Sequence, residues 1–418
     1  MSEPRGRPPR RRGRGRGGPG SGSDSGHGGR GGGHGSGGGG AAVHSMPPQS
    51  GGSGELIAAE GVLELVDRGG GFLRRRDASY LPGNGDVFVP QSVISRAKLR
   101  PGDEIIGEAN PSRNGKGPAL EKITSVFGRD PSICQERVEF TKLPASHPTE
   151  PLRLTIAGPT TRNGDITAAI VDLMIPLGKG QRALVVAPAK AGKTTLLTTL
   201  ARGIAANHPD VTIYILLADE RPEEVTEMEM AGTGEVIASS FDHAASRHVA
   251  VAETTLERAR RRVELGEDVV IILDSLTRLA RAYNNIDKGS GRTLSGGIGA
   301  EAMERPKRFF GSARAVDRKH GGGSLTIIAT ALKDTGSKGD EVIFEEFKGT
   351  GNAEIVLSRE LADRRVFPAI DIAASGTRRE ELLLSGEVLA RSHSFRQQSA
   401  GMPAHKQIEL IRELLQRG

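Results

Sequence analysis

The feature that most constrains this chain is a phosphate-binding loop at residues 187–194, which read Ala-Pro-Ala-Lys-Ala-Gly-Lys-Thr. A mostly apolar run, residues 181–187, precedes the loop, and a helix-forming run, residues 195–202, follows it. A strand, a glycine-containing loop and a helix N-terminus form the context in which such a loop binds phosphate. Ala187 replaces the first glycine of the usual GxxxxGK[ST] pattern. The sequence therefore predicts a nucleotide site on an α/β domain.

The residue types of this loop assign a role to each part of it. The backbone N–H groups cradle the phosphates, Lys193 is expected to contact the β- and γ-phosphate oxygens, and the Thr194 hydroxyl helps to hold Mg2+. We therefore expect ATP and Mg2+ as ligands. The predicted ATP-binding residues of this segment are Ala187, Pro188, Ala189, Lys190, Ala191, Gly192, Lys193, Thr194 and Thr195.

Two further apolar runs end in carboxylates. Residues 269–273 lead into Asp274, a position from which a carboxylate orients Mg2+ and its water; the alternative is a helix N-cap. Residues 211–218 lead into Asp219 and Glu220. Glu220 is expected to polarise the attacking water, which would make the site hydrolytic, although a surface salt bridge is an alternative for such a residue alone.

The pattern of turns and apolar runs divides the chain into four parts. Short strand-like segments at 61–66, 71–75, 86–89 and 103–108 predict an all-β domain over residues 55–127. Residues 128–150 contain prolines and predict an irregular connector. From residue 151 to 418, strands alternate with helices, which indicates an α/β domain with a largely parallel sheet.

The first part, residues 1–54, contains 21 of the 58 glycines and eight arginines against two acidic residues. It accounts for the whole net charge of +6, and it is predicted to be a disordered Gly/Arg-rich tail because it has too few apolar residues to build a core. A passive spacer and an arm that grips RNA phosphates both remain open for it.

The composition of the whole chain also limits where the protein can act. The single cysteine, Cys134, excludes an internal disulfide framework and fits a reducing compartment. No apolar run approaches the roughly 18 residues that a membrane span requires. We therefore expect a soluble, cytoplasmic protein with no membrane partner.

Seven segments resemble the motif set of the Rho family of bacterial transcription termination factors: residues 187–194, 219–228, 245–249, 273–283, 305–311, 334–338 and 365–371. The resemblance implies a RecA-like P-loop ATPase core behind an OB or cold-shock-like domain. It implies a homohexamer with ATP at the subunit interfaces. It further implies an ATP-dependent RNA translocase or helicase that binds nascent single-stranded RNA and releases it from the RNA polymerase elongation complex.

By the same resemblance, individual residues acquire roles in ATP hydrolysis. Glu220 matches the catalytic carboxylate and Phe367 the ring that packs on adenine. Arg378 matches an arginine finger supplied by the neighbouring subunit, with Arg221 and Arg365 nearby. Physically, an arginine that neutralises developing γ-phosphate charge can raise the rate by several orders of magnitude.

Two glycine-rich segments, residues 290–299 and 333–339, resemble the loops that line the RNA channel of such rings. Composition alone would make them ordinary surface loops. The resemblance places RNA contacts at Thr335, Gly336, Ser337 and Lys338, where the lysine would meet phosphates or 2′-hydroxyls.

In the β domain, Phe72 and Phe88 are expected to stack RNA bases, and Arg74 is expected to follow the RNA backbone. The chain departs from the family pattern here, since Gly70 stands where an aromatic is expected and residues 117–118 lack another. Each stacked base contributes roughly 1–3 kcal/mol, so two lost platforms would weaken this site.

Two other classes of protein remain alternatives at the level of sequence. Rotary ATP synthase subunits and flagellar or secretion ATPases also pair a small β barrel with a P-loop domain. A non-enzymatic RNA-binding protein would not need Lys193, Thr194, Glu220 and Asp274, all of which are intact.

Overall fold

The computed structural model describes residues 55–67, 69–111, 117–156, 165–287, 295–299 and 301–417. The predictions for the tail 1–54, and for residues 290–294 of the first glycine-rich loop, lie outside this part of the chain. The chain divides into a unit of residues 1–52 and a unit of residues 53–418, and every described residue belongs to the second. Among the described residues, no helix combines the length and the apolar character needed to cross a membrane.

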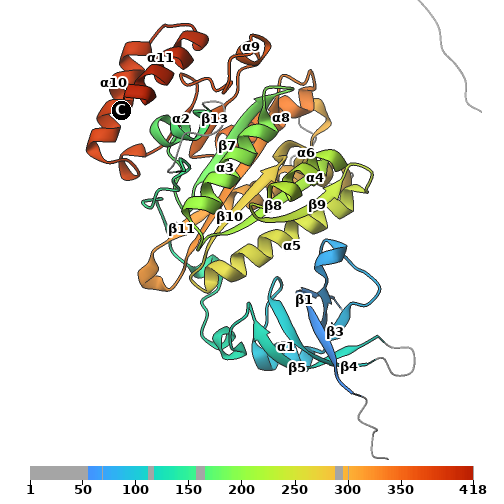
Figure 1. The fold of residues 1–418 in the computed structure, drawn as a ribbon. Coiled ribbons are helices and arrows are strands. Elements are labelled where there is room, and N and C mark those ends of the chain that lie inside the picture. Colours follow the sequence, from blue (N-terminus) through green and yellow to red (C-terminus); the bar gives the residue numbers. More distant parts are fainter. Residues whose placement is uncertain are drawn as a thin grey trace, which may run out of the picture. The chain divides into compact units, whose positions relative to one another are not determined.

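The N-terminal part of the described chain is a closed five-stranded barrel (Figure 1). Its strands in barrel order are β1 (Ile57–Leu65), β2 (Gly71–Arg74), β3 (Val87–Val89), β5 (Ala119–Val126) and β4 (Glu104–Asn110). A short helix, α1 (Gln91–Ala97), contributes Val93 and Ile94 to the barrel core. The predicted all-β domain is confirmed, although the sequence did not single out α1 or β5.

The predicted connector contains two 3-10 helices, η2 (Pro131–Gln135) and η3 (Phe140–Lys142), and the two-residue strand β6 (Ala145–Ser146). The connector is irregular, but it is packed against the rest of the protein, since Cys134 and Phe140 are each only 1% exposed. Burial raises the pKa of the Cys134 thiol to about 11. This thiol therefore behaves as a small apolar group of the barrel core.

Within the described residues, the C-terminal part is built on a nine-stranded sheet whose central strands run parallel (Figure 1). The parallel strands in spatial order are β13 (Ala353–Val356), β7 (Arg182–Pro188), β12 (Ser324–Lys333), β10 (Asp268–Asp274), β8 (Thr212–Glu220) and β9 (Glu235–Ser240). The antiparallel strands are β14 (Gly376–Thr377), β11 (Arg314–Val316) and β6. The predicted parallel α/β sheet is confirmed.

Helices cover both faces of this sheet, which is why its strands are continuously apolar. Along β10, Val269, Ile271 and Leu273 face one core, while Val270 and Ile272 face the other. The first core includes α5 (Ala245–Glu264), α6 (Leu276–Ile286), α7 (Glu304–Gly311) and α8 (Lys338–Lys348). The second includes α2 (Thr167–Met174), α3 (Lys193–Asn207), α4 (Pro222–Ala231), α9 (Arg359–Asp363), α10 (Gly386–Ser399) and α11 (Ala404–Arg417).

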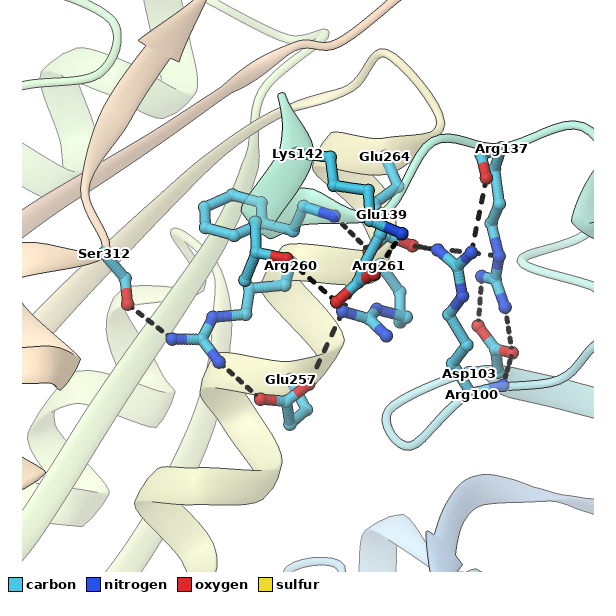
Figure 2. Close-up of polar contacts among 12 residues, drawn as sticks. Arg100, Asp103, Arg137, Glu139, Lys142, Glu257, Arg260, Arg261, Glu264 and Ser312 are labelled. Carbon is cyan, nitrogen blue, oxygen red and sulfur yellow. Dashed lines mark hydrogen bonds and ion pairs between the residues drawn. The ribbon is translucent and has the colours of Figure 1, made fainter. Parts of the chain in front are cut away.

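Buried ion pairs join the barrel and the connector to helix α5 (Figure 2). Arg137 pairs with Asp103, and both side chains are almost completely buried. Arg100 donates to Glu264 Oε2 at 2.8 Å, and the backbone N–H of Phe140 donates to Glu264 Oε1 at 2.8 Å. Removing one partner of a buried pair leaves an uncompensated charge that costs about 3–5 kcal/mol. This network therefore fixes the path of the connector over α5.

Candidate nucleotide and RNA sites

The phosphate-binding loop lies between the end of β7 at Pro188 and the start of α3 at Lys193. Gly192 is the N-cap of α3 with φ of 90°, and Lys190 has φ of 65°. The left-handed region favours glycine, so Gly192 stands where the tight turn into the helix requires it. Ala187 is still inside β7, paired with Leu332, where an extended backbone accepts a side chain. This explains how alanine replaces the first glycine of the pattern.

The Lys193 ammonium lies among carboxylates from two strand ends and a helix. Its Nζ is 2.7 Å from Asp274 Oδ1, 3.2 Å from Glu220 Oε1 and 4.0 Å from Glu224 Oε2. Burial alone would lower the pKa of Lys193, but these carboxylates outweigh it and raise that pKa above its ordinary value. The ammonium is therefore charged at neutral pH and positioned at the start of α3.

Glu220 closes β8 and is only 2% exposed. Burial, followed by the charge of Asp274, raises the pKa of Glu220, while Lys193 and Arg278 oppose the shift. A carboxylate with increased proton affinity in a partly enclosed site is suited to polarise water. Its burial also argues against a surface salt bridge.

Asp274 is the last residue of β10, and Ser275 rather than Asp274 caps the next helix. The Ser275 hydroxyl accepts from the backbone N–H of Arg278, so the N-cap alternative for Asp274 is wrong. Asp274 Oδ1 instead accepts from Lys193 Nζ and, at 2.7 Å, from the Thr330 hydroxyl. These contacts fix the direction of one carboxylate oxygen.

A magnesium ion would have to share its ligands with a nucleotide at this site. The described residues contain no group of three or more His, Cys, Asp or Glu side chains that could hold a metal. Thr194 Oγ1 lies 3.4 Å from Glu224 Oε2. Glu224 and Asp274 both lie within 4.0 Å of the Lys193 ammonium. A hydroxyl and a carboxylate are the hard oxygen ligands that Mg2+ takes together with phosphates and water. The residues present therefore fit Mg2+ bound with ATP.

A pocket of about 370 Å³ adjoins the phosphate-binding loop. Its walls include Gly192, Thr195 and Leu196 on one side and Phe367 and Pro368 on another. Phe367 is 48% exposed, so it offers apolar aromatic surface to a planar ligand in this pocket. The volume lies within the ~300–1,000 Å³ that is usual for ligand sites. This pocket is the candidate adenine site.

The three predicted arginines are all exposed. Arg221 is exposed directly after Glu220, and Arg365 is exposed in the segment that leads to Phe367. Arg378 is exposed directly after β14, and its backbone N–H donates to Asn352 O at 2.9 Å.

The position of Arg378 relative to the loop follows from the strand register. Thr377 pairs with Ala353, and Ala353 pairs with Ala183 near the start of β7. The phosphate-binding loop begins at the other end of β7, after Pro188, roughly 16 Å away at ~3.3 Å per residue. Arg378 therefore lies at the opposite end of the sheet from its own chain's loop.

Arg278 was not among the predicted site residues. Its Nε lies 3.1 Å from Glu220 Oε1, and its Nη1 donates to Asp219 Oδ2 at 3.2 Å. It projects from α6, one turn after Asp274. The signal that sequence reasoning missed is the row of polar residues at 278, 281 and 284, which share one face of a helix.

That face of α6 also contacts the end of the first predicted RNA loop and the start of the helix that follows the second. Arg281 Nε donates to Asp340 Oδ1 at 2.7 Å, at the start of α8. Asn284 Oδ1 accepts from the backbone N–H of Gly299 at 2.8 Å, and its Nδ2 donates to Gly297 O at 3.3 Å. A single helix thus contacts Glu220, the start of α8 directly after the second loop, and the described end of the first loop.

The loop before α8 carries the predicted RNA contacts. Thr335 Oγ1 donates to Asp340 Oδ2 at 2.6 Å, Gly336 has φ of 74°, and Ser337 caps α8. Lys338 is exposed in the first turn of that helix.

The two predicted RNA loops also lie against each other. A Cβ added at Gly296 would come within 2.6 Å of the backbone nitrogen of Gly339. Such a close approach requires glycine at position 296.

On the barrel, Phe72 and Phe88 are cross-strand partners whose ring centroids are 5.5 Å apart in an edge-to-face arrangement. The Arg74 guanidinium lies 5.1 Å from the Phe72 centroid, and it pairs with Glu64 and Asp86. Arg74 is 7% exposed, so its charge is compensated within the protein. Arg74 makes a cation–π contact with the Phe72 ring and thereby supports it.

The surroundings of Gly70 explain why this position has no aromatic side chain. Gly70 has φ of 88°, and a Cβ there would lie 2.8 Å from Cζ of Phe88. An aromatic side chain at position 70 is therefore incompatible with the present position of the Phe88 ring.

Two family models match separate parts of the chain. The family model "Rho termination factor, RNA-binding domain" matches residues 59–132, and "ATP synthase alpha/beta family, nucleotide-binding domain" matches residues 167–377. Transcription termination factor Rho of Haemophilus influenzae is 53% identical over 350 residues, which cover 84% of this chain and 82% of that protein. The Escherichia coli K12 factor is 54% identical over 340 residues, covering 81% and 80%. The Gemmatimonas aurantiaca factor is 51% identical over 371 residues, and the match spans 88% of this chain but half of that protein.

Two solved structures share the fold. One is a prototypical ATPase from the type III secretion system of pathogenic bacteria, with a TM-score of 0.52 and 24% identity over 68% of this chain and 76% of that chain. The other is the ATP synthase subunit NeqB of Nanoarcheaum equitans, with a TM-score of 0.51 and 18% identity over 61% and 62%. At this identity the likeness concerns the fold alone.

The geometry predicts that Lys193 and Glu220 act at different steps. Lys193→Ala should weaken ATP binding, because the loop loses its phosphate-facing charge. Glu220→Gln should leave ATP binding within about 3-fold and lower kcat by about 100-fold or more, because only the water-polarising carboxylate changes. Fluorescent-nucleotide titration and steady-state hydrolysis measure the two effects. Equal losses of nucleotide affinity in both variants would contradict the assignment.

Proposed function

Because this chain belongs to the Rho family of transcription termination factors, we propose that it is an ATP-dependent RNA translocase that binds nascent RNA and terminates transcription. The observation that carries the proposal is helix α6. It contacts the buried Glu220 through Arg278 and the described end of the first candidate RNA loop through Asn284. Through Arg281 it contacts Asp340, which is hydrogen-bonded to Thr335 of the second loop. We assign the chain three functional parts: the β domain at residues 55–127, the connector at residues 128–150 and the α/β ATPase domain at residues 151–418.

In the proposed reaction, the backbone amides of the loop and Lys193 hold the ATP phosphates, and the ring of Phe367 packs on adenine. Thr194 and Asp274 would hold Mg2+, which supplies charge neutralisation at the phosphates. Glu220 accepts a hydrogen bond from the attacking water and increases its nucleophilicity. Arg278 keeps the Glu220 carboxylate directed, because it lies 3.1 Å from the same oxygen that faces Lys193.

RNA would act on this chemistry through α6. RNA phosphates bound at Lys338 would change the preferred conformation of the loop formed by residues 335–337. That loop is bonded to Asp340, and Asp340 is bonded to Arg281. A shift of α6 would move Arg278 relative to Glu220, so hydrolysis would depend on RNA at the loops.

The arginine finger requires a second copy of the chain. Arg378 lies at the end of the sheet opposite to its own phosphate-binding loop, so it reaches a γ-phosphate only across a subunit boundary. A homohexameric ring would satisfy this need at each interface, with Arg221 and Arg365 as further cations near the phosphates. The ring would also place the loops of Lys338 around one RNA strand.

The barrel would bind the transcript before it enters the ring. Phe72 and Phe88 offer aromatic surface for base stacking, and the RNA-binding domain match covers both residues. The target would be the RNA of an elongating RNA polymerase, which places the action in the cytoplasm. Secretion and ATP synthase relatives share the fold, but the match at residues 59–132 favours RNA as the substrate.

Transcript release tests the proposed function directly. Stalled bacterial elongation complexes carrying long, unstructured transcripts should release RNA when the protein and ATP are added. Release should stop with a non-hydrolysable ATP analogue and with Glu220→Gln. ATP-independent release, or hydrolysis without any release from complexes with accessible RNA, would contradict the proposal.

Mixing experiments test the shared site. Arg378→Ala and Lys193→Ala proteins should each be inactive alone. Mixed rings contain interfaces where an intact loop faces an intact Arg378, so subunit exchange should restore part of the ATPase activity. Activity that never exceeds the background of either variant, although exchange is shown by mixed labelling, would exclude the finger in trans.

A further inference from the structure

Strand β8 contains a bulge immediately before Glu220. Ala218 pairs with Ser239 of β9 and Glu220 pairs with Ser240, so Asp219 is an extra residue without a partner position. Asp219 has φ of 61°, a conformation that residues other than glycine rarely adopt. Bulges redirect the side chains that follow them and occur next to active sites. The bulge therefore determines where the Glu220 carboxylate points.

Two helices face the Asp219 side chain. From α6, Arg278 Nη1 donates to Oδ2 of Asp219 at 3.2 Å. From the first turn of α5, His248 Nε2 lies 3.9 Å from Oδ1, a packing contact longer than a hydrogen bond. Each carboxylate oxygen thus faces a nitrogen on a different helix. The Arg278 contact also touches Glu220, whereas no described contact links His248 to the reacting groups.

His248 is itself held from the strand next to β8. It is 5% exposed, and its Nδ1 lies 2.8 Å from the hydroxyl of Ser239, which is 1% exposed. Burial lowers the pKa of His248, so the imidazole is neutral. When the Ser239 hydroxyl donates to Nδ1, the single ring proton is on Nε2 and faces Asp219. Ser239 is also the residue that pairs beside the bulge.

We propose that His248 is a positioning residue that packs the Nε2 edge of its ring against the Asp219 carboxylate and, together with the Arg278 hydrogen bond, confines Asp219 to its left-handed conformation and thereby aims Glu220 at the attacking water. His248 touches neither nucleotide nor water in this arrangement, so it acts only through Asp219. The inference rests on the proposed function in one respect, which is that Glu220 is the group that polarises water.

Steady-state ATP hydrolysis by full-length variants tests the inference. His248→Leu removes both ring nitrogens and should lower kcat by about 10- to 100-fold, the range expected for a misplaced catalytic group. The KM for ATP should stay within about 2-fold, because the phosphate-binding loop is untouched. His248→Gln keeps an amide donor near the Nε2 position and should recover most of kcat. His243→Gln, a change of the neighbouring and more exposed histidine, is the matched control and should equal wild type.

A double-mutant cycle with Asp219→Asn separates positioning from general damage. If His248 acts through Asp219, the His248→Leu and Asp219→Asn losses in kcat should be strongly non-additive. Should His248→Leu fail to fold, Ser239→Ala keeps the imidazole, removes its Nδ1 partner and should lower kcat in the same direction by a smaller factor.

Several results would overturn the inference. One is an unchanged kcat in His248→Leu. Another is a loss in kcat that is equal in the His248→Leu and His248→Gln variants. A third is a loss in kcat for His248→Leu that adds fully to that for Asp219→Asn. Basal hydrolysis without RNA is measured in parallel. Wild-type hydrolysis that RNA fails to stimulate would count against the proposed function, while the basal rates of the variants still decide the role of His248.

Discussion

The charge arrangement around Lys193 is the constraint on which the rest of the structure depends. One ammonium is held by Asp274 and Glu220, which close two different strands of the same sheet. Buried carboxylates this close together are tolerable only beside compensating cations. The parallel sheet supplies that geometry, because the carboxyl ends of β7, β8 and β10 meet at one edge. The nucleotide site is thus a direct product of the strand order.

The same constraint explains why α6 is central to the proposed function. This helix begins immediately after Asp274, so its first residues are fixed by the position of the carboxylate. Its later turns carry Asn284, which contacts the first loop, and Arg281, which contacts Asp340 directly after the second. A rigid helix that starts at the nucleotide site and ends at the RNA loops needs no additional element to link them. Coupling between ATP and RNA would therefore be built into one secondary-structure element.

The parts of this site that the sequence predicted are those whose chemistry is local. The phosphate-binding loop, Asp274 and Glu220 could be found because apolar strands run directly into polar residues. The bulge at Asp219 could not be predicted, since it depends on the register between β8 and β9. The burial of Arg74 between Glu64 and Asp86 likewise depends on barrel closure, so the sequence could not predict that the charge of this arginine is compensated within the protein. Gly70 is a further case, because the Phe88 ring that excludes a side chain there comes from a different strand.

The most direct test of the central claim is the stimulation of ATP hydrolysis by RNA in an Arg281→Gln variant. This change breaks the ion pair with Asp340 and leaves Arg278, Glu220 and the phosphate-binding loop intact. Arg308→Gln, which breaks an exposed pair with Glu304 on α7, is the control. We expect Arg281→Gln to bind ATP and RNA within about 3-fold of wild type and to lose at least about nine-tenths of the stimulation by RNA. Stimulation equal to that of the wild type and the control would contradict the account.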